Sequence, residues 1–133
     1  MEKPSDLQVS PPTDWQKFER MMADLFEAEW GSRAYLHGRT GQSQAGVDIY
    51  GKPDANGNYH GLQCKRRDAY AQQTVTIKEL KAEAKSARSF KPGLYQFSLL
   101  VTGQRDVKLQ EAARKLDKAS RAKRSFNIDV LFW

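Results

Sequence analysis

Three observations predict an α/β fold in which a mixed central sheet is flanked by helices. Segments with helical and strand-like periodicity follow one another in the order helix, strand, strand, strand, helix, strand, helix, strand. The Asn56-Gly57 pair between two strand segments favours an antiparallel hairpin. The mostly apolar segment 94–103 is typical of a strand covered on both faces. Because helices separate the later strands, we expect those strands to pair through helical crossovers.

The length of 133 residues suits one domain with a real core, and it is too short for a catalytic domain plus a separate binding domain. Residues 1–12 contain three prolines and two serines and are predicted to form a flexible lead. The ordered domain is therefore expected to span residues 13–133. Because the chain stops on the apolar Leu131-Phe132-Trp133, we expect it to be a fragment of a longer protein.

Charge and cysteine content narrow the class of protein. The net charge is +6, and segment 105–124 carries eight basic residues against three acids. This run indicates either a polyanionic partner or the solvated side of an amphipathic helix. The lone Cys64 excludes an internal disulfide and a cysteine-based zinc site, which fits a reducing, cytoplasmic setting. No apolar stretch approaches the roughly 20 residues of a membrane span, so we expect no membrane partner.

The first helix is predicted to begin at Thr13, whose hydroxyl can cap it while Gln16 closes a capping box, and to end at Gly31. Its apolar stripe consists of Trp15, Phe18, Met22, Leu25 and Phe26. Strands follow at residues 33–37, 46–50 and 59–65.

A second helix is predicted over residues 74–89, before Pro92-Gly93, with an apolar side made of Val75, Ile77, Leu80, Ala84 and Ala87. The buried strand 94–103 comes next. A third helix over residues 106–124 and a last strand over residues 126–133 complete the order.

The chemistry is concentrated on the predicted hairpin. In a strand, Val47 and Ile49 point inward and the carboxylate of Asp48 emerges on the opposite face. On the next strand, Gln63 and Lys65 share one face, which places an oxygen ligand and a positive charge opposite the acid. Such a group can hold a hard divalent cation together with a phosphate, as metal-assisted phosphodiester cleavage requires.

The proposed ligand set contains oxygen donors only. Asp48 is the primary metal ligand, and Gln63 adds its side-chain carbonyl beside the backbone carbonyl of Cys64, a set that suits Mg²⁺. Lys65 then lies near the phosphate and the attacking water. A second carboxylate is needed, and Glu19, at the margin of the apolar stripe, is the preferred supplier, with Glu29 as its rival.

Structural interpretations of the same residues stay open. Asp48 alone can be an acid at a strand edge, and Lys65-Arg66-Arg67 alone can be a solvated charge run. His37 and His60 lack the spacing of metal ligands, and Cys64 suits the core. The residues expected to contact nucleic acid come from the polar loop 38–46, the end of the hairpin and the second helix: Arg39, Gln42, Gln44, Arg66, Arg67 and Lys81.

The ordered set of Glu19, "GVDI" around Asp48 and "LQCKRR" with Gln63 and Lys65 resembles the PD-(D/E)xK nuclease superfamily. The closer likeness is to its Mrr-like restriction endonuclease branch, in which a glutamine commonly replaces a carboxylate. The resemblance covers roughly residues 13–133. The stretch "FKPGLYQFSLLVTGQRDVKLQEAARKL" also resembles Mrr-like domains at the N-terminus of bacterial antiphage defence proteins.

The resemblance implies a restriction-endonuclease-like fold and Mg²⁺-dependent cleavage of double-stranded DNA with little sequence preference, with Mn²⁺ as a substitute. It implies that Glu19 and Asp48 lie at the metal, that Gln63 completes the ligands and that Lys65 lies at the water. Val47 replaces the proline of the superfamily's name, which affects no ligand. It further implies an antiphage effector that acts as a homo-oligomer, such as a dimer, or fused to sensor or ATPase domains.

Two other functions stay open at the level of sequence. A catalytically weak or inactive module could keep the fold and bind nucleic acid or a partner protein, because Gln63 weakens the cage. An RNase could use the same scaffold, because no residue reports on the 2′-hydroxyl.

Overall fold

The computed structural model describes residues 14–39, 42–67 and 73–133, so the lead predicted for residues 1–12 lies outside the described residues. The described residues form a five-stranded sheet in the spatial order β1-β2-β3-β4-β5. The strands are β1 (Ala34–Leu36), β2 (Ile49–Gly51), β3 (Tyr59–Lys65), β4 (Leu94–Val101) and β5 (Asn127–Phe132). The helices are α1 (Trp15–Trp30), α2 (Ile77–Ala87) and α3 (Val107–Ala122).

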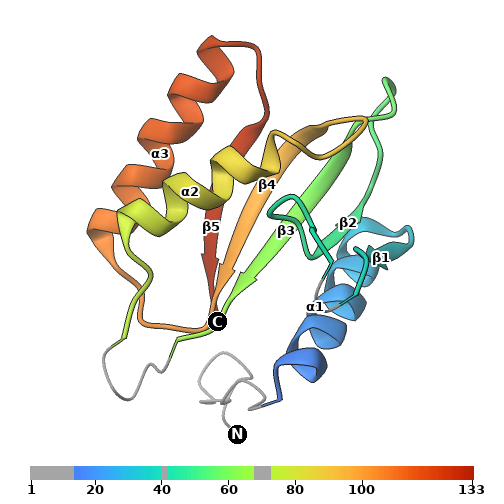
Figure 1. The fold of residues 1–133 in the computed structure, drawn as a ribbon, viewed down its shortest axis with the longest axis horizontal. Coiled ribbons are helices and arrows are strands. Elements are labelled where there is room, and N and C mark those ends of the chain that lie inside the picture. Colours follow the sequence, from blue (N-terminus) through green and yellow to red (C-terminus); the bar gives the residue numbers. More distant parts are fainter. Residues whose placement is uncertain (1–13, 40–41, 68–72) are drawn as a thin grey trace, which may run out of the picture.

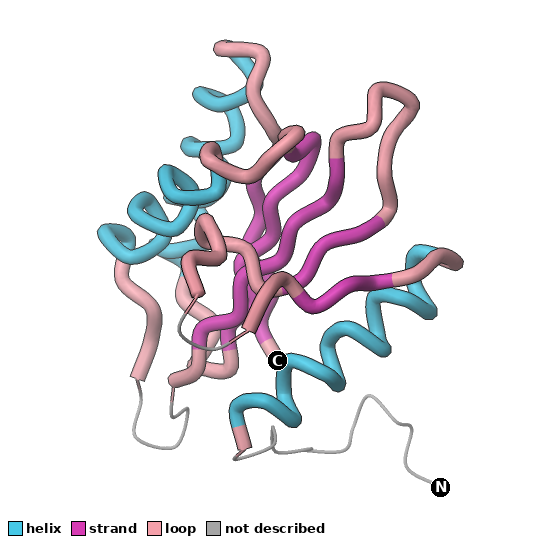
Figure 2. The backbone as a smooth tube through the Cα atoms, turned by 45° about the vertical axis from the view of Figure 1, so that its right-hand side comes forward, coloured by secondary structure: helices cyan, strands magenta, loops and turns pink. Residues whose placement is uncertain are grey.

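The sheet is mixed, as predicted. Strands β1, β2 and β3 pair antiparallel, whereas β3, β4 and β5 pair parallel through the crossovers that contain α2 and α3. Helix α1 lies on one face of the sheet, and α2 and α3 lie on the other (Figures 1 and 2). The α/β prediction and its element order are therefore confirmed. None of the helices in the described part of the chain is both long and apolar enough to span a membrane.

Several predicted boundaries move by a few residues. Helix α1 is capped by Asp14, whose carboxylate accepts a hydrogen bond from the Lys17 backbone N–H, so the prediction of a Thr13 cap closed by Gln16 is wrong. Thr13 itself lies outside the described residues. Helix α2 begins after Thr76, which forms a capping box with Glu79, and not at residue 74.

Two apolar clusters fill the space on either side of the sheet. The larger one joins α2 and α3 to the sheet through Leu80, Phe97 and Leu109, and the smaller one joins α1 to it through Phe18 and Met22. Two residues of the predicted apolar helix faces are not buried: Leu25 is 55% exposed, and Ile77 at the start of α2 is also exposed.

A buried polar chain lies on the face of the sheet toward α1. The Ser98 hydroxyl donates a hydrogen bond to the Asp129 carboxylate, so its oxygen accepts one from Nε2–H of His60, 2.8 Å away. The His60 ring also packs against Phe26 and Trp30 of α1. His60 is therefore both buried and hydrogen-bonded.

We expect the free energy of unfolding to fall as the pH drops below 6.5, because burial, with a smaller effect from the charge of Lys52, lowers the pKa of His60 from 6.5 to about 4. The unfolded chain binds a proton in this window and the folded chain does not. The stabilisation is thus fully present above pH 6.5 and is lost as the pH falls through about 4. A shift of this size corresponds to about 3 kcal/mol. Urea titrations across this pH window measure it.

The substitution His60→Gln is the control for this prediction. It is expected to remove most of the acid-side fall, whereas His37→Gln should keep it because His60 is still present. Burial raises the pKa of Asp129, and this acts in the opposite direction in both chains, so the comparison isolates His60. Parallel stability curves for the wild type and His60→Gln would contradict the assignment.

Candidate metal and phosphate site

The site forms where β3 extends beyond its neighbour β2. Strand β2 pairs with β3 only as far as Leu62, whereas the last three residues of β3 pair with β4 alone. One edge of β3 is therefore open at this end of the described sheet. A pocket of about 630 Å³ lies there, with walls from α1, the loop after β1 and the end of β3.

Asp48 lies directly before β2, at a bend, and it takes the place of the missing strand neighbour. Its backbone N–H donates to the Leu62 carbonyl at 2.8 Å, and its Oδ2 accepts from the Cys64 N–H at 2.9 Å. The bend places Val47 against α2 and Ile49 against α1, so the prediction that both point to one face is wrong. Asp48 is only 5% exposed.

The pKa of Asp48 is raised, chiefly by burial. The hydrogen bond from the Cys64 N–H lowers it, the charge of Glu83 raises it, and the charges of Lys65 and His37 lower it. Because the effect of burial is the largest of these, the charged form of Asp48 is poorly solvated in the pocket. A cation in the pocket would favour that charged form.

Gly46 allows the segment before Asp48 to lie close against α2. Its φ is +66°, and a Cβ added there would lie 2.8 Å from the Ser86 Cβ and 3.0 Å from the Glu83 carbonyl oxygen. Gly46→Ala is therefore expected to destabilise the fold by about 2 kcal/mol or more, because backbone strain adds to a steric clash with a helix backbone. Urea unfolding measures the loss.

The matched control is Gly57→Ala, at φ +80° but with no atom within 4 Å of the added Cβ. It carries the backbone strain alone, and we expect a cost of about 1 kcal/mol. Equal losses for the two variants would show that the contact with α2 contributes nothing.

Glu19 reaches the pocket from α1. It is half-buried and lines the same walls as Asp48. Burial raises the pKa of Glu19, the nearby negative charge of Asp48 raises it further, and a hydrogen bond from the Trp15 side chain lowers it. Glu29, the rival carboxylate, is exposed and is not among the residues that line the pocket. Among the described residues, the carboxylates that line the pocket are therefore Glu19 and Asp48.

Neutral oxygens complete the set of donors. The side-chain Oε1 of Gln63 is buried and has no hydrogen-bond partner among the described residues. The Lys65 carbonyl accepts from the Thr102 N–H on the β4 side, so the alternation of a strand turns the N–H and carbonyl of Cys64 to the open edge. The Cys64 thiol packs in the core beneath α1, and burial raises its pKa.

These donors fit a hard divalent cation. The described residues contain no cluster of three His, Cys, Asp or Glu side chains that could hold a metal ion by themselves. Two carboxylates, an amide oxygen and a backbone carbonyl are all oxygen ligands, which Mg²⁺ prefers while it keeps several waters. An orphaned amide oxygen beside two poorly solvated carboxylates is the arrangement that such an ion would satisfy.

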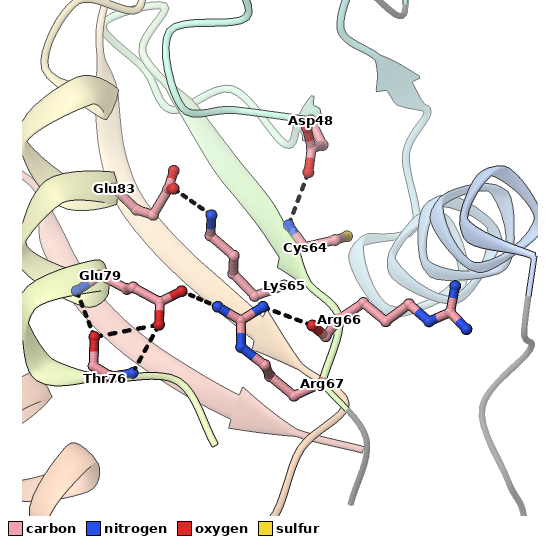
Figure 3. Close-up of polar contacts among 8 residues, drawn as sticks. All are labelled: Asp48, Cys64, Lys65, Arg66, Arg67, Thr76, Glu79 and Glu83. Atoms are coloured by element: carbon pink, nitrogen blue, oxygen red, sulfur yellow. Dashed lines mark hydrogen bonds and ion pairs between the residues drawn. The ribbon is translucent and has the colours of Figure 1, made fainter. Parts of the chain in front are cut away.

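Lys65 has a partner that the sequence did not reveal. Its Nζ lies 2.6 Å from Oε1 of Glu83 on α2, with the two side chains 25% and 18% exposed. Arg67, two residues later, forms an ion pair with Glu79, one helical turn earlier on α2 (Figure 3). The four-residue spacing of the two glutamates in the sequence was the available signal for a shared helix face.

The predicted nucleic-acid contacts divide into two groups. Arg39 and Arg66 are exposed at the pocket, and Figure 3 shows Arg66 extending away from α2 toward α1. Arg67 lines the pocket but is paired with Glu79. Arg20 of α1 also lines the pocket, and the sequence reasoning missed it.

The remaining predicted contacts have other positions. The Gln44 amide donates to the His37 carbonyl at 2.7 Å, so this side chain braces the loop beside Asp48 while it lines the pocket. The Gln42 side chain accepts from the Arg39 N–H. Neither Gln42 nor Lys81, which is exposed on α2, is among the described residues that line the pocket.

The sheet is mixed and flanked by three helices, and acids and a lysine lie at the open end of its hairpin. This arrangement is consistent with a restriction-endonuclease-like fold. The chain belongs to the Mrr_cat family, described as a restriction endonuclease, whose model matches residues 12–125. The family indicates endonuclease activity in general. No curated protein and no solved structure matches the chain.

Proposed function

We propose that this domain hydrolyses phosphodiester bonds of double-stranded DNA and that it depends on Mg²⁺, with Mn²⁺ as a substitute. The ion would be held by Glu19, Asp48, the Gln63 side-chain oxygen and the Cys64 carbonyl. The observation that supports this most is the convergence of Glu19 and Asp48, both with a raised pKa, in one pocket. A divalent cation would remove the mutual repulsion of these two carboxylates.

Each residue has a defined task in this proposal. When bound, the ion would neutralise phosphate oxygens and activate a water molecule. Asp48 fixes the cage, because its Oδ2 is anchored to the Cys64 N–H and its backbone is bonded to β3. Lys65 supplies a positive charge beside the scissile phosphate and orients the attacking water.

Arginines at the pocket suit a polyanionic substrate. Arg20, Arg39 and Arg66 are exposed there, so their guanidinium groups are available to bind backbone phosphates. Contacts of this kind carry no base information, which favours cleavage with little sequence preference. They also make binding salt-dependent.

The wider role rests on the family resemblance. We propose that residues 13–133 form the nuclease domain of a longer cytoplasmic protein, an antiphage defence effector. This effector would work as a homodimer or through fused sensor or ATPase domains.

Digestion of supercoiled plasmid tests the function. We expect nicking and linearisation with Mg²⁺ or Mn²⁺ and none with chelator, with matched DNA and RNA duplexes to identify the substrate. Cleavage of RNA alone would redirect the proposal to an RNase. Salt-sensitive DNA retention without cutting in either metal would contradict the enzyme and favour the binding module.

A further inference from the structure

Helix α2 presents two carboxylates to the basic end of β3. Glu79 and Glu83 lie one turn apart and pair with Arg67, just beyond β3, and with Lys65, the last residue of β3 (Figure 3). The carboxylate of Glu79 also accepts from the backbone N–H and hydroxyl of Thr76, so it closes the helix cap. Glu83 takes no part in the cap, and among the described residues its carboxylate pairs with Lys65.

Glu83 is held on a rigid part of the helix. Leu80, Ala84 and Ala87, all within about one turn of Glu83, are buried in the larger apolar cluster, so this part of α2 is packed against the sheet. The Glu83 backbone also lies against Gly46, where an added Cβ would come within 3.0 Å of its carbonyl oxygen. Gly46 precedes Asp48 by two residues, so one helical turn touches the segment that holds Asp48 and binds the side chain of Lys65.

A lysine amine stays in one position only if a partner such as the Glu83 carboxylate holds it there. Its stem has four rotatable bonds, and ordering it costs side-chain entropy. The ion pair with Glu83 limits the amine to a small volume next to Asp48, whose pKa responds to both charges. Glu83 is not among the residues that line the pocket, so its position suits an action through Lys65 and not a metal ligand.

We propose that Glu83 is a positioning residue of the nuclease site, which holds the Lys65 ammonium in place for the phosphate and the attacking water. This inference rests on the proposed function. It assigns the role to a residue of α2 that neither touches the substrate nor binds the metal.

Glu83→Gln tests it, because the amide keeps the volume and removes the charge. We expect kcat for plasmid nicking to fall about tenfold or more, while KM for DNA and the affinity for Mn²⁺ stay near the wild-type values. A second readout needs no nuclease activity: competitive labelling of amines, followed by peptide mass spectrometry, should show severalfold faster labelling of Lys65 relative to the other lysines.

The matched control is Glu79→Gln, on the same face of α2. Glutamine can still close the capping box, so the helix start is kept while the pair with Arg67 is weakened. We expect wild-type kcat and unchanged labelling of Lys65.

Three results would overturn the inference. Wild-type kcat in Glu83→Gln would exclude positioning, unchanged labelling of Lys65 would exclude restraint by Glu83, and lost Mn²⁺ affinity would make Glu83 a ligand. A wild-type chain that cuts nothing would contradict the proposed function itself, so the two failures are distinguishable.

Discussion

Asp48→Asn is expected to lower Mg²⁺-dependent nicking by about a thousandfold or more while the domain stays folded. The change removes the more buried charge of the proposed cage. The asparagine oxygen can still accept the hydrogen bond from the Cys64 N–H, so the contact between the loop and β3 is kept. Because burial raises the pKa of Asp48, removing its charge should leave thermal stability unchanged or increased.

Cleavage activity is expected to fall while thermal stability does not, so the loss of activity can be distinguished from unfolding of the domain. Nicking rates and thermal melts on the same samples measure both. The control is Asp24→Asn, an exposed acid of α1 outside the pocket, which should cut like the wild type. If Asp48→Asn cuts DNA at a rate near that of Asp24→Asn, Asp48 is not a residue of the catalytic site.

Lys65→Met is expected to lower the single-turnover cleavage rate by about a hundredfold or more, because methionine keeps much of the stem and removes the amine. Retention of DNA should change little, since Arg20, Arg39 and Arg66 remain at the pocket. Mn²⁺ affinity should also persist, because the proposed ligands are untouched. Rapid-quench cleavage and filter retention measure the two effects separately.

The control for this change is Lys78→Met, at an exposed position on α2. It removes one positive charge from α2 outside the pocket, and the cleavage rate should stay at the wild-type level. If Lys65→Met cuts as fast as Lys78→Met, the lysine has no part in the chemistry.

The order of the elements could be predicted from the sequence because local patterns specify it. The Asn56-Gly57 turn lies in the connection between β2 and β3, and the apolar run 94–101 is the buried strand β4. The alternation that separates Gln63 from Cys64 also holds, because β3 is regular at its end. Boundaries were less accurate where capping side chains, such as Asp14 and Thr76, decide the helix start.

The parts that could not be predicted depend on contacts between distant segments. The bend at Asp48 breaks the strand period, because the carboxylate bonds to the Cys64 N–H just before β2 begins. The pairing of Lys65 with Glu83 depends on how α2 crosses the sheet, which the sequence pattern does not specify. Arg20 was missed for the same reason: its place at the pocket follows from the packing of α1.

The most direct measurement of the metal site is anomalous diffraction from crystals of this domain grown with Mn²⁺. One strong peak is expected in the pocket, about 2 to 2.5 Å from oxygens of Asp48, the Cys64 carbonyl and Glu19, with Lys65 facing it. A peak bound elsewhere on the chain, or no peak in the pocket at saturating Mn²⁺, would contradict the account.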